Sequence, residues 1–411
     1  MKRKSYINIM LVAFCSCASF MVQGQELEYF IKETLKNNPG IQAYQLKYDI
    51  ANEYINETKA LPNTEFGFGY FVSEPETRTG AQKARVSVKQ MLPWFGTLTA
   101  RENYAASLAE TTYLELVILQ RKLLLTVSQS YYKLYVLQEK STVIKEKIAL
   151  LKNYEELALV SLEVGKASAV DVLRLQIRQN ELDAELETIE RRYKTETAIF
   201  QELLNRKDSV TVVFPWALQL PETDHWVALD SISLHPELEK YEKLSASVEK
   251  SIQLNEKDAN PNLGFGLDYI AVAERPNLNF SDNGKDILMP MISLSIPLFN
   301  SSYRSKLKQL NLKKKEIYSL KKQRSNLLAS LLTSALEQQA TARKQYHTQL
   351  KNLEHARDAE EILTKTYENG TIDFTDILDI QELQLAFQVK RLDAIESYFI
   401  ASSKINYLTN Y

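Results

Sequence analysis

Two short stretches of this chain place apolar residues at every second position. In the first, Phe66, Phe68 and Tyr70 alternate with glycine. In the second, 263–269, leucine, phenylalanine and tyrosine alternate with Gly264, Gly266 and Asp268. Period two describes a strand with one apolar face. Each stretch precedes a polar, turn-rich segment and a second apolar segment, so the pattern predicts one antiparallel hairpin at about 64–92 and another at about 262–296. Pro290 weakens the last strand, since proline cannot donate to a ladder.

Most of the remaining chain has the spacing of helices. Residues 97–164 and 301–369 contain neither proline nor glycine, which predicts two continuous helices, each about 100 Å long. Shorter helices are expected before each hairpin. After Gly165 and Gly370 the helical pattern resumes to about residues 204 and 408. Apolar residues recur in it at intervals of seven: Leu175, Leu182 and Ile189 in the first case, and Leu378, Leu385, Leu392 and Phe399 in the second. This spacing predicts coiled-coil packing between neighbouring helices.

The order of these elements occurs twice, which indicates an internal duplication. Asp171 lies as far from Gly165 as Asp376 lies from Gly370. Arg174 occupies the position in the first copy that Asp379 occupies in the second. We therefore predict a first repeat at 25–205, with a helical hairpin at about 97–205, and a second at 231–411, with a helical hairpin at about 301–408. Residues 206–230, rich in valine, proline and aromatic residues, are expected to form a linker with a short strand or belt-like patch.

The first residues have the pattern of a secretory signal peptide. Lys2, Arg3 and Lys4 precede an apolar run that ends near Met21, and cleavage is expected after Gly24, which makes 1–24 the signal peptide. Both cysteines, Cys15 and Cys17, lie within it in poor settings for lipid attachment, so ordinary cleavage is favoured. Removal of three basic residues leaves 47 Lys and Arg against 52 Asp and Glu, a net charge of −5 that does not favour nucleic acid.

The chain offers little for catalysis. The four histidines lack the spacing of a metal site, and His347 and His355 are expected on a helix surface. No phosphate-binding loop or nucleophile motif is present, so we expect no enzyme activity, cofactor or metal site. Trp94 is expected to be a packing or interface anchor. Later segments lack the length of apolar sequence that a transmembrane helix requires.

The hairpins raise a different possibility, because their strands are long enough to cross a bilayer when tilted. Four strands cannot close a barrel, and an open edge in lipid leaves backbone groups unpaired. Copies of the chain would have to pool their strands. The alternative, an antiparallel hairpin packed on a soluble core, is not excluded by the alternation alone.

At this point the chain resembles the TolC-like outer-membrane efflux proteins over residues 26–411. The resemblance is carried by Asn38-Pro39, Pro62-Asn63, Leu92-Pro93-Trp94-Phe95-Gly96 and the segments around the two glycine turns. It implies a mainly helical homotrimer with a membrane β section, in which a 12-stranded β-barrel continues into a periplasmic α-helical barrel. It also implies an outer-membrane location in contact with lipid, a periplasmic adaptor protein, and an inner-membrane pump of the RND type.

The resemblance also assigns roles to residues near the glycine turns. The turns become the periplasmic tips that dock the adaptor, at Val164, Gly165, Lys166, Asn369, Gly370 and Thr371. The pore constriction is expected from Asp376 and Asp379, with Asp373 on the same helix face. Tyr367 and Asp171 match residues of a latch that some members complete with an arginine. Here Ile372 takes that place, which puts an arginine-based latch in doubt and leaves a Tyr367–Asp171 hydrogen bond as the expectation.

Three functions follow from this reading. The first is the outer-membrane channel of a tripartite efflux system for drugs or metal cations. The second keeps the channel but exports polypeptides in a type I secretion system. The third, from another class, is a periplasmic coiled-coil scaffold without a pore, which accounts for the helices but not for the hairpins.

Overall fold

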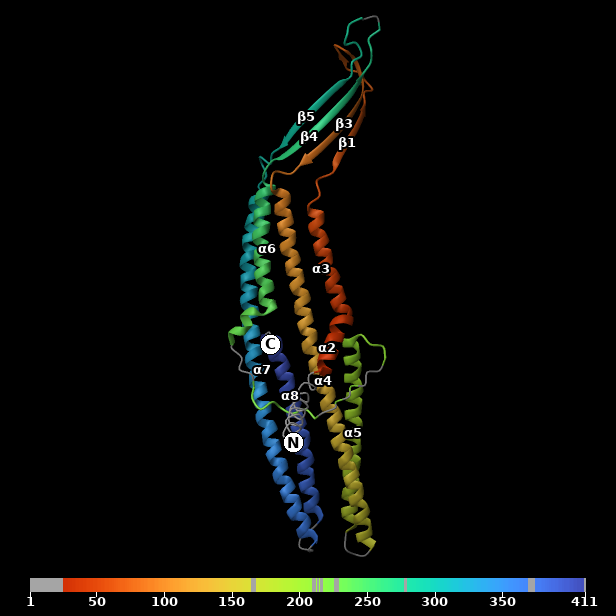
Figure 1. The fold of residues 1–411 in the computed structure, drawn as a ribbon, viewed down its shortest axis with the longest axis vertical. Coiled ribbons are helices and arrows are strands. Elements are labelled where there is room, and N and C mark those ends of the chain that lie inside the picture. The colour runs from red at the N-terminus through yellow and green to blue at the C-terminus, as the bar shows by residue number, and fades with distance from the viewer. Residues whose placement is uncertain are drawn as a thin grey trace, which may run out of the picture. The chain divides into compact units, whose positions relative to one another are not determined.

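The structure is a computed structural model. It describes residues 25–163, 168–208, 212, 214, 217–224, 229–276, 279–368 and 374–409. The chain divides into two compact units. The sheet unit contains Tyr44–Leu116 and Pro236–Arg324, and the helical unit contains the chain up to Ala43, Val117–His235 and Ser325–Tyr411. Two long helices contribute residues to both units (Figure 1).

The helices repeat in length as well as in order. Helices α4 (Thr97–Glu163) and α7 (Ser302–Glu368) each contain 67 residues, and α5 (Ala169–Leu204) and α8 (Phe374–Thr409) each contain 36. The shorter helices are α2 (Gln25–Asn37), α3 (Pro39–Thr58) and α6 (Pro236–Asp258), with a short 3-10 helix at Leu229–Leu234. The mainly helical prediction is confirmed.

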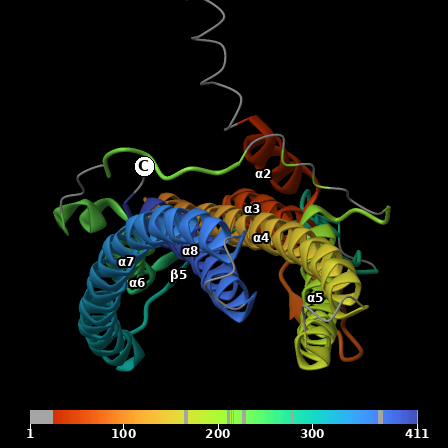
Figure 2. The ribbon, with the colours of Figure 1, turned by 90° about the horizontal axis from the view of Figure 1, so that it is seen from below.

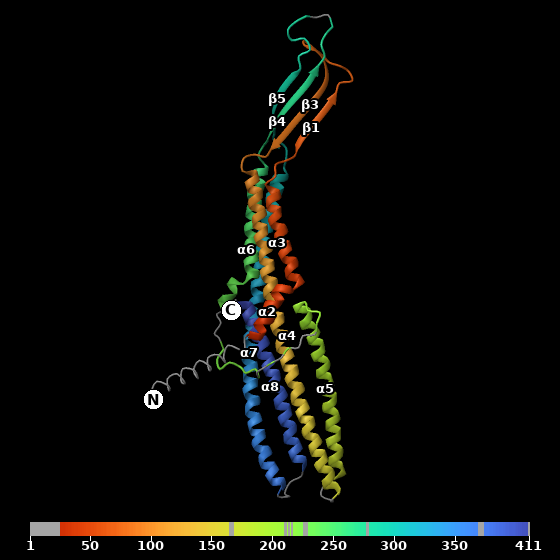
Figure 3. The same ribbon diagram turned by 45° about the vertical axis from the view of Figure 1, so that its right-hand side comes forward.

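In the sheet unit, the two predicted hairpins join into one antiparallel sheet (Figure 3). Its strands are β1 (Thr64–Tyr70), β3 (Gly80–Leu92), β4 (Asn262–Val272) and β5 (Ile287–Ser295), in the order β1-β3-β4-β5, and the short β2 (Glu76–Thr77) pairs with β3. Strand β3 begins at Gly80, within the segment expected to be a turn, because its first residues pair with β2. Pro290 lies in β5, at an edge of the described sheet, where a missing donor is tolerated best.

Strands β3 and β5 are each followed by a short segment that leads into a long helix, and the two segments have similar sequences. Phe95 follows Pro93 after β3 and is 77% exposed, and Phe299 follows Pro297 after β5 and is 99% exposed. Trp94, predicted to be an anchor, is half-buried and packs edge-on against Phe95.

In the helical unit, α5, α4, α8 and α7 lie next to one another in a curved row (Figure 2). The predicted heptad positions Leu175, Leu182 and Ile189 are buried against Ile144 and Leu151 of α4. Coiled-coil burial therefore occurs where the seven-residue spacing placed it. Asn205 caps the C-terminal end of α5, and its φ of 55° is the left-handed conformation that asparagine tolerates.

The described residues of the linker, 206–208, 212, 214 and 217–224, are not in a strand and contact α4; we call them the belt. Val212 packs against Val127 and Tyr131 of α4, and the N–H of Leu218 donates to the Tyr135 hydroxyl at 2.8 Å. In this part of the chain, no residue between 206 and 224 that the structure describes is in a strand. Val210 and Val213, on which that expectation rested, lie outside the described residues.

Within the described part of the chain, no helix combines the length and the apolar composition needed to cross a membrane.

Candidate functional site: sheet faces and helix ends

The sheet has two chemically different faces, and the strand register defines them. Phe68, Val86, Tyr269 and Leu288 form a row across all four strands, and Phe66, Val88, Leu267 and Pro290 form the next row. All of these side chains are exposed except Val88, which is half-buried, and Phe66 and Phe68 are each exposed by 77%. An apolar face of this extent facing water would be strongly unfavourable, which points to lipid or to a partner.

The opposite face is mixed. The row after Phe68 contains Gly69, Arg85, Ile270 and Ile287, and the row before it contains Gly67, Ser87, Asp268 and Met289. The carboxylate of Asp268 is fully buried and forms an ion pair with Arg85. Gly264 leaves no room for a larger side chain, because a Cβ at this position would lie 2.2 Å from Ser293 Oγ. With its ion pair and its glycines, this face is nevertheless the more polar of the two.

The predicted gate carboxylates lie on the first turns of α8. Asp376 and Asp379 are exposed, and among the described residues neither forms an ion pair within 4 Å. Tyr367 lies in the last turn of α7 and is 40% exposed. Asp373 and all six predicted tip residues, Val164, Gly165, Lys166, Asn369, Gly370 and Thr371, lie outside the described residues, as does Ile372.

Asp171 has a role that the sequence did not indicate. Ser168 Oγ accepts a hydrogen bond from the N–H of Val170 at 3.2 Å, and the N–H of Ser168 donates to Asp171 Oδ2 at 3.3 Å. This is a capping box, which satisfies backbone donors at the start of α5. A hydrogen bond between Asp171 and Tyr367 would either be added to this capping contact or replace it.

Arg174, which replaces the third carboxylate in the first repeat, links two helix starts. Its Nη1 donates to Thr375 Oγ1 of α8 at 3.2 Å. One turn further along, Arg178 donates to both carboxylate oxygens of Glu382 on α8, at 2.8 and 2.5 Å. The start of α8, which carries Asp376, is therefore held to α5.

A family model described as outer membrane efflux protein matches residues 30–206 and 230–410. The chain belongs to this outer membrane efflux family. It is accordingly an efflux channel of the TolC-like type in the outer membrane, with helices in the periplasm, and not an enzyme.

Solved structures share the fold of this outer membrane efflux protein at low sequence identity. The outer membrane protein VceC of Vibrio cholerae is 13% identical, with a TM-score of 0.74 over 94% of this chain and 96% of that chain. The CmeC outer membrane channel of Campylobacter jejuni is 14% identical, with a TM-score of 0.72 over 93% and 85%. The open state of the MtrE channel of Neisseria gonorrhoeae is 14% identical, with a TM-score of 0.74 over 93% and 88%. A search of curated proteins gives no match.

The efflux protein contains a repeated polar clamp near its helix ends. In the first repeat, Gln176 and Gln179 of α5 donate to the two carboxylate oxygens of Glu155 at 2.7 and 2.8 Å, which lowers the pKa of Glu155. In the second, the amides of Gln381 and Gln384 donate to those of Glu360 at 2.8 and 2.7 Å. Gln176 and Gln381 each lie eleven residues after the glycine of their repeat, and this match is the sequence signal for the clamp.

The second clamp receives a further, buried group. Lys147 of α4 is 8% exposed, and its ammonium donates to Gln381 Oε1 at 2.8 Å. Burial lowers the pKa of Lys147 from 10.5 to about 8. Gln381, 1% exposed, also donates to the Tyr154 hydroxyl at 2.7 Å. A polar layer thus connects α4, α7 and α8 close to Asp379, and sequence periodicity alone gave no sign of it.

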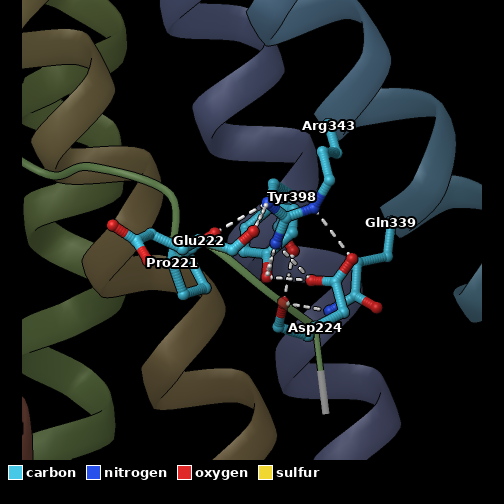
Figure 4. Close-up of polar contacts among 7 residues, drawn as sticks. Pro221, Glu222, Asp224, Gln339, Arg343 and Tyr398 are labelled. Atoms are coloured by element: carbon cyan, nitrogen blue, oxygen red, sulfur yellow. Dashed lines mark hydrogen bonds and ion pairs between the residues drawn. The ribbon is translucent and has the colours of Figure 1, made fainter. Parts of the chain in front are cut away.

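A second polar cluster fastens the belt to α7 and α8 (Figure 4). Arg343 donates to both carboxylate oxygens of Asp224, at 2.8 and 2.6 Å, and to the carbonyl of Pro221 at 2.6 Å. The Tyr398 hydroxyl donates to Asp224 at 2.5 Å, and Arg343 lies 5.1 Å from the centre of the Tyr398 ring. Hydrogen bonding to Asp224 raises the pKa of Arg343. We call this cluster the belt clasp.

The described histidines differ in burial. His347 and His355 are exposed on α7, as predicted, whereas His235 is 1% exposed and packs against Tyr407. In the part of the chain that the structure describes, no three His, Cys, Asp or Glu side chains could hold a metal ion together.

Proposed function

We propose that this protein forms a homotrimeric channel in which three four-stranded sheets close a 12-stranded β-barrel and the long helices form a periplasmic α-helical barrel. One observation carries the proposal: a sheet with an exposed apolar face and two unpaired edges, β1 and β5. In lipid, each unpaired edge group costs several kcal/mol. Copies that pair β5 with the next β1 remove both edges, and three copies give an even number of strands in the usual range.

In this barrel, one face of each sheet would contact lipid and the other would line the lumen. The rows that contain Phe66 and Phe68 face lipid, and the rows that contain Arg85 and Asp268 face the lumen. The mature chain would be residues 25–411, with repeats at 25–205 and 231–411, an equatorial linker at 206–230 and a signal peptide at 1–24.

Transport would involve small molecules, either drugs or metal cations, moving from the periplasm to the exterior. The energy would come from an inner-membrane pump of the RND type, joined through a periplasmic adaptor that docks at the tips around Gly165 and Gly370. Export of polypeptides in a type I secretion system is the alternative conduit. A scaffold without a pore leaves the apolar sheet face unexplained.

The gate is proposed at Asp376 and Asp379, with Asp373 beside them. Six carboxylates from Asp376 and Asp379 of three copies would repel one another near the axis, so cations would bind there and favour closure. Opening would be a two-state movement of the returning helices, α5 and α8, at the tips near Tyr367 and Asp171. Divalent cations at millimolar concentration should therefore reduce conductance of reconstituted channels. Conductance and cation block that are unaltered in Asp376→Ala/Asp379→Ala would refute the gate.

Membrane insertion is tested on neighbouring residues of one strand. Phe68→Arg places a charge on the proposed lipid face, at a cost of about 2–4 kcal/mol near mid-bilayer, whereas Gly69→Arg points to the lumen. The first variant should be depleted from outer-membrane fractions and lose its detergent-stable oligomer, and the second should not. Equal behaviour of the two variants would contradict the assignment of the faces.

A further inference from the structure

The four helices of the sheet unit form a row whose seams are crossed by ion pairs. Each of the three seams contains at least two such pairs. At the first seam, Lys47 of α3 and Lys59, the residue directly after α3, pair with Glu115 and Glu102 of α4. The other pairs are Lys243–Glu110 and Arg101–Asp258 between α4 and α6, and Lys314–Glu249 and Lys321–Glu242 between α6 and α7. Helices α3 and α7 are the end members of this row, so each has one side without a helix neighbour in the described chain.

The free side of α3 is acidic. Asp49, Glu53 and Glu57 recur at intervals of four residues, which places them on one face of the helix. All three are exposed, and in the described residues none forms an ion pair within 4 Å. Beside them, Leu46 and Ile50 are 62% and 71% exposed. A face that combines apolar and acidic side chains lacks its partner in a single copy.

The free side of α7 is basic. Leu310 and Ile317 turn toward Val248 of α6, and the other side of α7 carries a stripe at spacings of four, seven and seven: Arg304, Lys308, Lys315 and Lys322. These four are exposed and have no ion pair within 4 Å among the residues that the structure describes. The stripe therefore offers the charge that the acidic face of α3 lacks.

We propose that the basic stripe of α7 docks on the acidic stripe of α3 from a second copy of this chain. This inference rests on the proposed homotrimer and specifies which helix faces form its contact. The two stripes differ, so the contact is heterologous and repeats around a closed ring. The strand edges support it, because α3 leads into β1 and α7 follows β5, the two open edges of the sheet.

The positions of the charges define a register. Helix α3 runs toward the sheet and α7 runs away from it, so the docked helices are antiparallel. Glu57 is one residue before the end of α3, and Arg304 is two residues after the start of α7. Glu53 and Lys308 each lie four residues further from the sheet. Arg304 therefore faces Glu57 of the second copy, and Lys308 faces its Glu53.

Charge reversal and its repair test this docking. Glu53→Lys/Glu57→Lys and Arg304→Glu/Lys308→Glu each place like charges opposite one another, and the fourfold variant restores opposite charges with the signs exchanged. Glu239→Lys/Glu256→Lys is the matched control, since both residues are exposed on α6. The measurement is the association constant of the full chain in detergent, by analytical ultracentrifugation or native mass spectrometry, at 50 and 500 mM NaCl.

Each reversal should weaken association by about tenfold or more, the fourfold variant should return to within about threefold of wild type, and the control should change little. High salt should weaken wild-type association and strengthen that of the reversals. Reversals that behave like the control, or a fourfold variant without recovery, overturn the docking while the trimer stands. If a reversal does not fold, the variants Glu53→Ala and Lys308→Ala and the double variant give the coupling free energy of association between these two residues. A wild-type protein that stays monomeric contradicts the homotrimer itself.

Discussion

Replacing Lys147 with methionine should change how the stability of the helical unit depends on pH. The ammonium of Lys147 is 8% exposed, and burial lowers its pKa from 10.5 to about 8. The folded protein thus releases this proton near pH 8, while the unfolded chain keeps it until about pH 10.5. Between these values the unfolded state binds more protons, so the free energy of unfolding rises with pH.

The size of this effect follows from the shift. A difference of about 2.5 pKa units corresponds to about 3 kcal/mol, present as a penalty below pH 8 and relieved by pH 10.5. Lys147→Met removes the penalty but also removes the donor to Gln381 Oε1, at a cost of about 1 kcal/mol. At pH 7 the methionine variant should therefore be more stable by about 2 kcal/mol, and near pH 10.5 the wild type should regain about 3 kcal/mol relative to it.

The assay is denaturant unfolding in detergent, followed by helical circular dichroism, for wild type, Lys147→Met and Lys147→Arg at pH 7, 8.5 and 10. The difference between wild type and methionine isolates Lys147 from other groups that titrate in this range. Arginine keeps its charge, so it should show the penalty at every pH. A wild-type minus methionine difference that is constant across this range would refute the lowered pKa and the buried position of Lys147.

Three further outcomes are expected. Gln381→Ala should lower the free energy of unfolding by about 2–3 kcal/mol, because it leaves buried Lys147 without its acceptor. Gln176→Ala, at an exposed position, should lower it by about 1 kcal/mol, and equal unfolding midpoints of the two variants would contradict this difference. Gly264→Ala should lower the thermal midpoint of the folded oligomer, because its Cβ meets Ser293 and Met91, while Gly69→Ala, with nothing within 4 Å, should not; similar midpoints would argue against the sheet packing. Arg343→Ala should release the belt clasp, cost about 2–3 kcal/mol and expose residues 217–224 to limited proteolysis, which exposed Lys344→Ala should not do; unchanged cleavage would count against the clasp.

Sequence periodicity was sufficient for the elements whose partners share their pattern. The absence of proline and glycine from 97–164 predicted α4 closely, because nothing in that span interrupts helical hydrogen bonding. Leu175 and Leu182, chosen by their seven-residue spacing, are both 0% exposed. Alternation with glycine likewise located β1 and β4, since their apolar residues and their glycines fall on opposite faces.

Contacts between distant segments were not predictable in this way. The pairing of β3 with β4 joins the two hairpins, and no local pattern specifies it. Lys147 lies in a helix with mixed charges, where a lysine is normally solvated, and only the side chains from α8 and α7 make it a buried group. The role of Asp171 depends on backbone geometry at Ser168, which a carboxylate spacing of three does not reveal.

The exposed phenylalanines after β3 and β5 have a consequence for how the proposed channel sits in its bilayer. Phe95 and Phe299 occupy equivalent places in the two repeats, so three copies would present six aromatic rings at one level. Aromatic rings prefer the interface between headgroups and hydrocarbon. Such a ring would set the depth of immersion, and bilayers of unequal thickness would have to adapt at the outer rim of the strands.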